Sequence, residues 1–431
     1  MASSEIHNPS SPVTVPNLTN LLSDEILLRI LSSSPSSTLV SSSLVSKRLL
    51  QLSGHLRHTI VLLDWSSLPL LPSRFPNISN LNLIPASFPP PSLSSHILLS
   101  RSKLSIPVPC GAEFGKCFCL DQEAYDEGLK IVADAFPGLR RLSILAVASE
   151  NAVLNLGEKC PILQELDLHN CSDSSLQNIS AFSNLQILRL VATVEGVYSG
   201  SGITDIGLTI LARGCKRLVK LELGGCEGSY AGVSAIGTCC SMLEELTISH
   251  HRMDAGWMAG LSCCENLKTL KFLGCRNIDL DPGSDEHLGS CPIVERLHLQ
   301  RCQLRDKRSL RALFIICDKV RDILFQDCWG LTDDMFSITS FCRSVRFLSL
   351  HRCSRLTTEG LQSVVLSWNE LQHLSVISCN KVKDSEVSSA MSNLFSILKE
   401  LKWRPDSRSF LKASLRGTGM GKKGTKFFKK T

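Results

Sequence analysis

Residues 160–171 read CPILQELDLHNC, and this stretch decides how the rest of the chain is interpreted. Leu166 and Leu168 alternate with Asp167, which predicts a short strand with one buried and one exposed face. Counted from Cys160 as offset 0, apolar residues or cysteines occupy offsets 0, 3, 6, 8 and 11. This spacing can be searched for along the whole sequence.

The same spacing recurs many times, which is typical of a repeat protein. Apolar residues at offsets 3, 6 and 8 define twelve copies, which start at Phe75, Phe136, Cys160, Phe182, Cys215, Cys240, Cys264, Cys291, Cys317, Cys342, Trp368 and Phe395. From Cys215 onward the starts are 24 to 27 residues apart, and the pattern LxxLxLxxC falls in the range of leucine-rich repeats. One copy buries too little apolar surface to fold alone, so the copies must stack. We therefore expect an α/β leucine-rich-repeat solenoid, with parallel strands on its concave face and helices on its convex face.

Segments between the expected strands have apolar residues three or four positions apart. Examples are ITDIGLTILARGC (203–215), LTDDMFSITSFC (331–342) and LTTEGLQSVVLSW (356–368), each with Thr or Asp near its start as a candidate N-cap. The sequence therefore predicts one short helix per repeat. The irregular segments 84–120 and 194–202 lengthen two of the intervals and are predicted to be surface loops.

The chain has 19 cysteines, and fourteen of them stand at offset 0 or offset 11 of a copy. We expect structural thiols there, since a small, weakly polar side chain suits a tight buried corner. Disulfides or zinc are the alternatives, and a fixed spacing without CxxC pairs or matched histidines disfavours both. Cys110, Cys117 and Cys119, with His96, are a weaker candidate for a metal, against a loop cluster that binds nothing. We expect neither a metal nor a cofactor.

The net charge of +6 comes from one end of the chain. Residues 407–431 hold eight Lys or Arg and no acid, so the rest carries a net charge of −2, and nucleic acid is an unlikely partner of the folded body. For this basic tail a flexible segment or a weak nuclear-import signal is favoured over binding to nucleic acid or an anionic membrane. The sequence has no run of 18 apolar residues, and its first residues do not resemble a secretion signal. We expect a chain that does not enter membranes and lies in the nucleus, the cytoplasm or both.

Residues 20–62 do not follow the repeat and predict a small helical module. In LLSDEILLRIL (21–31), Ser23 is a candidate N-cap and two acids occupy the first helical turn. A second helical pattern follows in TLVSSSLVSKRLLQL (38–52). The domain prediction is thus a disordered stretch over 1–19, the module over 20–62, the solenoid over 63–406 and the basic tail over 407–431.

The module resembles a known adaptor-binding motif. LSDEILLRIL (22–31) and LVSKRL (44–49) resemble the F-box, whose pattern begins LPDEIL and continues to LVSKRW, although Ser23 replaces the usual Pro. Together with the ITDxGLxxLAxxC phrasing of residues 203–215, the chain resembles plant-type F-box/leucine-rich-repeat proteins. The resemblance implies a non-catalytic substrate receptor of a Skp–cullin–F-box ubiquitin ligase. Such a receptor binds a Skp-family adaptor, and through it cullin and RING subunits, while its solenoid binds a protein substrate. The adaptor contacts that it implies are Leu22, Ile26, Leu27, Ile30, Leu31, Leu44 and Val45.

Substrate contacts are expected from strand geometry, because offsets 7, 9 and 10 should point to the concave face. The candidates are Asp167, His169, Asn170, Glu222, Lys271, His298, Gln300, Arg301, His351 and Arg352. Their character changes from acidic to basic along the chain, which predicts a partner of opposite polarity, although an ordinary solvated face remains an equal alternative for any single residue. The chief rival function is a protein-binding scaffold without ligase activity, in which residues 20–62 only cap the solenoid.

Motifs of known enzyme classes fail or are missing from the sequence. GTGMGKKG is similar to a phosphate-binding loop, but Arg416 stands in place of the first Gly and Lys423 in place of Ser or Thr. HExxH, GxSxG and paired CxxC motifs do not occur. We therefore expect any enzymatic activity to belong to partners.

Overall fold

A computed structural model describes residues 21–88, 96–99, 105–108, 119–192, 202–284, 288–291, 293–406 and 415–416. Its main feature is one sheet in which thirteen parallel strands follow each other in chain order. These are β1 (Thr59–Val61), β2 (Asn80–Asn82), β5 (Arg141–Leu145), β6 (Glu165–His169), β7 (Ile187–Val191), β8 (Lys220–Gly224), β9 (Glu245–Ser249), β10 (Thr269–Leu273), β11 (Arg296–Gln300), β12 (Asp322–Gln326), β13 (Phe347–His351), β14 (His373–Ile377) and β15 (Glu400–Arg404). A short antiparallel strand, β16 (Leu415–Arg416), adds to β15.

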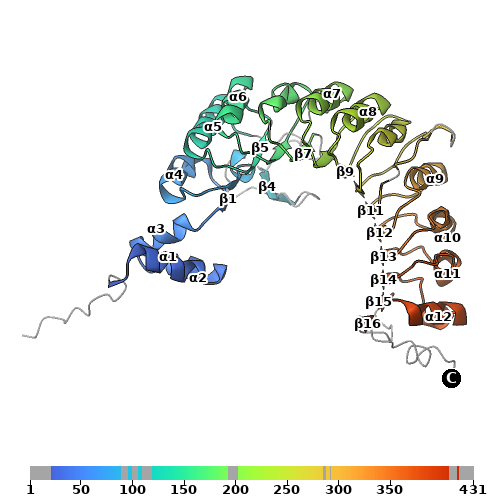
Figure 1. The fold of residues 1–431 in the computed structure, drawn as a ribbon. Helices are drawn as coiled ribbons and strands as arrows, with labels where there is room; N and C mark the ends of the chain where they lie inside the picture. Colours follow the sequence, from blue (N-terminus) through green and yellow to red (C-terminus); the bar gives the residue numbers. More distant parts are fainter. Residues whose placement is uncertain are drawn as a thin grey trace, which may run out of the picture.

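The sheet curves into an arc, with the strands on its inner side and the helices on its outer side (Figure 1). The outer helices are α4 (Leu71–Arg74), α5 (Gln122–Ala135), α6 (Glu150–Lys159), α7 (Asp205–Gly214), α8 (Tyr230–Cys239), α9 (Lys307–Ile316), α10 (Asp333–Phe336), α11 (Thr358–Val365) and α12 (Ser389–Ile397). Strands β2 and β5 to β15 match the twelve expected copies at the same offset, so the solenoid prediction is confirmed.

Repeats differ in how they cross the outer face. Helix α7, helix α10 and helix α11 form where the sequence predicts helices, and Thr204, Thr332 and Thr357 cap their first turns. Other repeats use tighter 3₁₀ turns instead, at Ser174–Leu176, Ile179–Ala181 and Trp257–Cys263. The prediction of one α-helix per repeat is therefore wrong for these copies, which use the tighter 3₁₀ geometry.

One core runs through the solenoid, from Leu62 to Trp403. It includes apolar residues at offsets 3, 6 and 8 of the strands and apolar residues of the outer helices, such as Leu129 and Leu208, so neighbouring repeats share one core. All fourteen cysteines at offsets 0 and 11 are buried free thiols, as expected for structural cysteines. Sγ of Cys328, for example, lies 3.2 Å from the carbonyl oxygen of Leu299 in the preceding repeat, and burial raises the pKa of this thiol to about 12.

The chain turns sharply at offset 10, just after the strand, in eight of the repeats. Asn170, His250, Arg301, Asp327, Arg352 and Ser378 all have positive φ there, between 47° and 59°. Gly225 and Gly274 occupy the same offset in two other repeats, also with positive φ. This left-handed residue turns the chain away from the sheet immediately before the buried cysteine.

The structure describes part of the expected surface loop over 84–120. Strands β3 (His96–Leu99) and β4 (Ser105–Val108) pair as an antiparallel ladder, and Leu120 N–H donates to the Ser87 carbonyl at 3.0 Å, which closes the base of the excursion. Cys119 is partly buried against the core, whereas Cys110, Cys117 and the His96 side chain lie outside the described residues. The segments 1–19 and 194–201 and most of the basic tail also lie outside them.

Candidate functional site

Three short helices precede the solenoid and pack on one another: α1 (Asp24–Ser32), α2 (Ser36–Ser43) and α3 (Lys47–His55). Ser23 caps α1 as expected, accepting a hydrogen bond from Ile26 N–H at 3.4 Å. Arg48 ties α3 to α1, because its guanidinium lies 2.6 Å from the Asp24 carboxylate. A small core of Leu27, Leu31 and Leu52, separate from the solenoid core, holds this three-helix module together.

The expected adaptor contacts divide between the inside and the outside of the module. Leu27 and Leu31 form its core and Leu22 packs against them, so these three stabilise the helices. The other four are exposed: Ile26 (46%), Ile30 (50%), Leu44 (83%) and Val45 (73%). Helical spacing could not separate the two groups within residues 22–31, because buried and exposed residues there belong to one broad apolar stripe, whereas Leu44 and Val45 follow α2. Leu21 and Val40 are also exposed and were not among the expected contacts.

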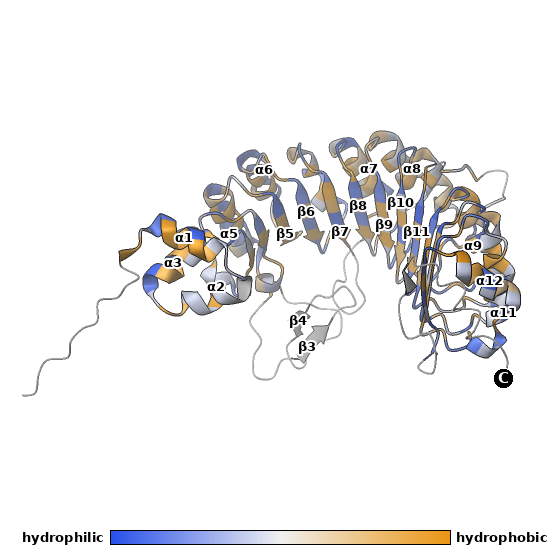
Figure 2. Ribbon diagram, turned by 60° about the horizontal axis from the view of Figure 1, so that its bottom comes forward, coloured by the Kyte–Doolittle hydropathy of each residue, from blue (hydrophilic) through white to orange (hydrophobic). Residues whose placement is uncertain are grey.

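Much of α1 and α3 is coloured as hydrophobic in Figure 2, and six large apolar residues of this module are exposed. We refer to Leu21, Ile26, Ile30, Val40, Leu44 and Val45 together as the module surface. Large apolar side chains gathered on one small unit indicate a site for a protein partner, since water solvates them poorly. Among the residues that the structure describes, no helix is long and apolar enough to cross a membrane.

The module ends earlier than the sequence predicts. Strand β1 begins at Thr59, inside the range 20–62, and pairs with β2 as the first strand of the solenoid sheet. Gly54 at the end of α3 is buried against α4, where an added Cβ would lie 2.1 Å from the Arg74 carbonyl oxygen. The Asn77 side chain also donates to the His55 carbonyl at 2.9 Å. Close contacts thus join the module directly to the first repeat.

The concave face carries the expected substrate candidates in three different environments. Asp167, Glu222, Lys271, His298, Gln300 and His351 are partly exposed on their strands. His169 is buried and lies 2.9 Å from the Asp167 carboxylate, so it supports that side chain and does not face a partner. Asn170, Arg301 and Arg352 are the left-handed residues at the strand ends, at the edge of the face.

Acidic residues of the first half of this face are already paired with cations. Arg189 on β7 lies 3.1 Å from Glu222 on β8 and 3.9 Å from Asp167 on β6. Burial raises the pKa of Asp167, but the hydrogen bond from His169 and the nearby charges outweigh it and leave a lowered pKa. The expected change from an acidic to a basic surface is therefore wrong for this half, because neighbouring strands place opposite charges side by side.

A second row of charges, at offset 5, was missed by the sequence reasoning. Glu245 lies 2.8 Å from Lys220 and 2.7 Å from Lys271, which neutralises the middle of the face. The pKa values of His298 and His351 are lowered, mainly by burial, so both are neutral at physiological pH. The alternation of strand residues places offset 5 on the same face as offset 7, and this signal could have revealed the row.

No group of three or more His, Cys, Asp or Glu side chains is arranged to hold a metal ion within the described ranges. Burial raises the pKa of most of the buried thiols, Cys215 and Cys328 among them, so these behave as inert core residues. The pKa values of Cys302 and Cys379 are lowered, chiefly by a hydrogen bond with the buried thiol of the preceding repeat. The surfaces described so far can bind a macromolecule, and they show no arrangement for covalent chemistry.

Fold and surfaces together define a leucine-rich-repeat solenoid with a small helical module at its amino-terminal end. In comparisons with known proteins, no family model matches the chain. It is 28% identical over 159 residues to the F-box protein MAX2 homolog A of Petunia hybrida, covering 34% of this chain and 20% of that protein. It is 22% identical over 230 residues to the BTB/POZ domain-containing protein FBL11 of Arabidopsis thaliana, covering 43% of this chain and 24% of that protein. The chain thus spans about a fifth to a quarter of the length of these curated relatives.

Solved structures that are similar to the chain also belong to repeat proteins. An internalin from Listeria monocytogenes is 15% identical, with a TM-score of 0.38, over 67% of this chain and 77% of its own. A TLR13–ssRNA13 complex is 16% identical, with a TM-score of 0.41, over 64% of this chain and 41% of its own. Both curated relatives are plant proteins, and one of them is named as an F-box protein.

Proposed function

We propose that the chain is the substrate-recognition subunit of a Skp–cullin–F-box ubiquitin ligase. The module surface binds a Skp-family adaptor, which connects the chain to cullin and RING subunits. The solenoid binds a protein substrate and holds it near the ubiquitin-loaded enzyme, so the chain contributes proximity and orientation while its partners perform the chemistry. The observation that carries this proposal is the exposure of Ile26, Ile30, Leu44 and Val45 on a module with its own buried core.

Module geometry suits this role because recognition and folding use different residues. Leu27, Leu31 and Leu52 hold the helices together. Ile30 and Leu44 lie outside that core, so they can be changed without removing its packing. A carboxylate at either position would have to be desolvated in an apolar interface, which weakens binding strongly.

The test is co-purification of a recombinant Skp-family adaptor with the full chain. We expect the double variant Ile30→Asp with Leu44→Asp to stay folded and to bind the adaptor at least about tenfold more weakly. The matched control is Ile206→Asp with Ile397→Asp, which places two carboxylates at exposed apolar positions of α7 and α12. Unchanged adaptor binding by the module variant would contradict the assignment of the module surface as the adaptor site, and no adaptor binding by the unchanged chain would favour a scaffold without ligase function.

The same role fits a reducing compartment, because the repeats keep their buried cysteines as free thiols. We therefore include the nucleus, the cytoplasm or both as the proposed location. Microscopy of the full chain fused to a fluorescent protein would test this location, and accumulation in the secretory pathway would contradict it.

A further inference from the structure

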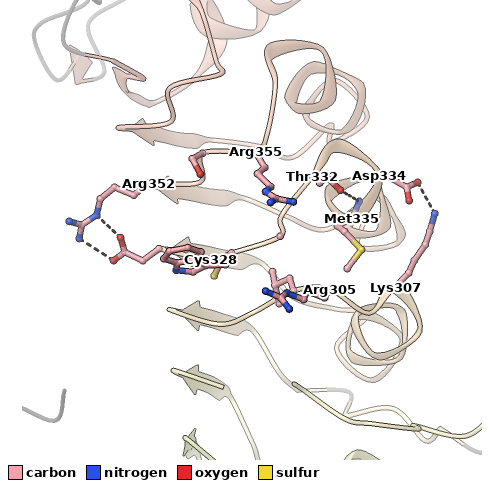
Figure 3. Close-up of a pocket in the computed structure, with 13 residues that line it drawn as sticks. Arg305, Lys307, Cys328, Thr332, Asp334, Met335, Arg352 and Arg355 are labelled. Atoms are coloured by element: carbon pink, nitrogen blue, oxygen red, sulfur yellow. Dashed lines mark hydrogen bonds and ion pairs between the residues drawn. The ribbon is translucent and has the colours of Figure 1, made fainter. Parts of the chain in front are cut away.

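A pocket opens at the edge of the sheet where β11, β12 and β13 end (Figure 3). Its volume is about 650 Å³, and three successive repeats line it. It lies outside the strand positions of the concave face, so none of the features above explains it. The volume falls in the range of sites that hold a compact ligand or part of a larger one.

Trp329 gives this pocket an exposed aromatic wall. Its backbone is held firmly, because its N–H donates to the Cys302 carbonyl at 2.9 Å and its carbonyl accepts from Leu304 N–H at 2.6 Å. The next residue, Gly330, has a φ of +87°, and an added Cβ there would lie 2.3 Å from the Leu304 carbonyl oxygen. The side chain of Trp329 is nevertheless 70% exposed. A large apolar side chain on a fixed backbone loses little entropy on binding and is typical of protein interfaces.

Some of the charged side chains around the pocket form ion pairs, and others do not. Lys307 pairs with Asp334 at 2.7 Å, and Arg352 pairs with Asp327 at 2.6 Å, so both acidic groups are occupied. Arg305 and Arg355, which lie between these two ion pairs in Figure 3, make no hydrogen bond or ion pair with any other residue that the structure describes. Two guanidinium groups and an exposed indole therefore face the same opening without partners of their own.

We infer, building on the proposed function, that this pocket docks an acidic peptide segment of the substrate protein. The segment carries carboxylates that pair with Arg305 and Arg355, on either side of an apolar residue that packs on Trp329. Arginine suits carboxylates because its planar fork donates two parallel hydrogen bonds. An aromatic side chain between two guanidinium groups allows the pocket to recognise both the charge and the shape of the peptide. Asp327 and Asp334 also line the pocket and are neutralised by Arg352 and Lys307, so Arg305 and Arg355 are left as two separate positive charges. Separate charges suit carboxylates on separate residues better than the continuous phosphate chain of a nucleic acid.

The direct test is fluorescence anisotropy with the purified full chain and no ligase subunit. The probe is a labelled peptide with two glutamates on each side of a central leucine, and its control is the same peptide with glutamine in place of glutamate. We expect the glutamate peptide to bind, and its affinity to fall as salt is added, because exposed charges are screened. The glutamine peptide should bind at least about tenfold more weakly.

Variants then locate the site on the chain. Arg305→Glu with Arg355→Glu should abolish binding of the glutamate peptide, and Trp329→Ala should weaken it about tenfold. The control is Arg213→Glu with Lys216→Glu, which changes the net charge equally at exposed positions near the end of α7 and should leave binding intact. All three positions of the pocket variants are exposed, so their folding is not at risk.

Equal binding of both peptides, or unchanged binding by the double arginine variant, would overturn the inference. So would binding of an oligodeoxythymidine in place of the glutamate peptide. Adaptor co-purification with the pocket variants separates this result from the proposed ligase role. A chain that binds the adaptor but not the peptide contradicts only the pocket, whereas one that binds the peptide but not the adaptor contradicts only the ligase role.

Discussion

Asp205 shows how single residues connect one repeat to the next. Its carboxylate accepts hydrogen bonds from Ser229 N–H at 2.8 Å and from Gly232 N–H at 2.9 Å, so it caps the first turn of the following helix. Burial raises the pKa of Asp205, but the bonds from Ser229 and Gly232 outweigh it and leave a lowered pKa. Gly232 is required beside it, because an added Cβ would lie 2.4 Å from the carboxylate oxygen.

The same contact, in which an Asp carboxylate accepts backbone hydrogen bonds from the next repeat, recurs elsewhere in the solenoid. Asp173 accepts from Thr204 N–H at 2.8 Å and Gly207 N–H at 3.0 Å, and Asp333 accepts from Thr357 N–H at 2.8 Å. The sequence pattern TDxG is thus explained by these contacts between repeats. The Asp caps the next helix, and the Gly makes room for the Asp of the previous repeat. Sequence reasoning identified the Thr caps and missed the bonds between repeats.

Replacing Asp205 should destabilise the solenoid. We expect Asp205→Ala to lower the free energy of unfolding by about 1–2 kcal/mol, since two backbone N–H groups lose their acceptor. Urea unfolding followed by circular dichroism measures the change. Asp254→Ala is the control, because Asp254 is exposed and no side-chain bond to another residue is seen for it. An equal loss of unfolding free energy in the two variants would show that the hydrogen bonds of Asp205 to the next repeat contribute nothing to stability.

At the scale of elements, the connection between β9 and the 3₁₀ helix Trp257–Cys263 contains a partly buried imidazole. His251 lies edge-on to Trp257, with ring centroids 5.3 Å apart, and its Nδ1 accepts from Met253 N–H at 3.3 Å. Burial lowers the pKa of His251 to about 4. Between this value and the ordinary pKa of 6.5 the unfolded chain binds more protons at this site than the folded chain. The stabilising contribution is therefore present above pH 6.5 and is lost as the pH falls toward 4.

This titration predicts how stability depends on pH. We expect the free energy of unfolding of His251→Gln to fall less steeply between neutral and mildly acidic pH than that of the unchanged chain. Urea titrations at a series of pH values measure the slope. His55→Gln, at an exposed position of α3, is the matched control and should keep the original slope. A parallel decline in all three proteins would rule out His251 as the source.

At the scale of the whole molecule, the chain has two cores of very different size. The solenoid core runs from Leu62 to Trp403, and the module core of Leu27, Leu31 and Leu52 is separate from it. The two units meet through Gly54 and the start of β1. Because stacked repeats depend on their immediate neighbours, removing a unit at one end should affect mainly the first repeat.

Deletion of residues 1–56 should therefore leave the solenoid folded. We expect the shortened chain to keep the helix and strand signal of the repeats, and its main thermal transition should shift by only a few degrees, as expected for a small end effect. Circular dichroism of the two chains measures this. Loss of the cooperative transition would show that the module is an integral part of the solenoid, as the scaffold alternative requires.

The repeat spacing alone was enough to predict the solenoid, the number of copies and the buried cysteines. These features depend on local periodicity, which a single copy such as residues 160–171 already displays. Caps such as Ser23 and Thr204 were also predictable, because a helix start depends on a few neighbouring residues.

Tertiary structure alone decided which apolar residues of the module face solvent, and which charges of the concave face are already paired. Leu27 and Ile26 are adjacent in sequence, yet one is buried and the other exposed, because burial depends on how three helices pack. Arg189 neutralises Glu222 because residues 33 positions apart become neighbours in the sheet. The same stacking assembles Arg305, Trp329 and Arg355 from three repeats into one pocket. Local periodicity therefore determines the scaffold, and the distances between stacked repeats determine what that scaffold can bind.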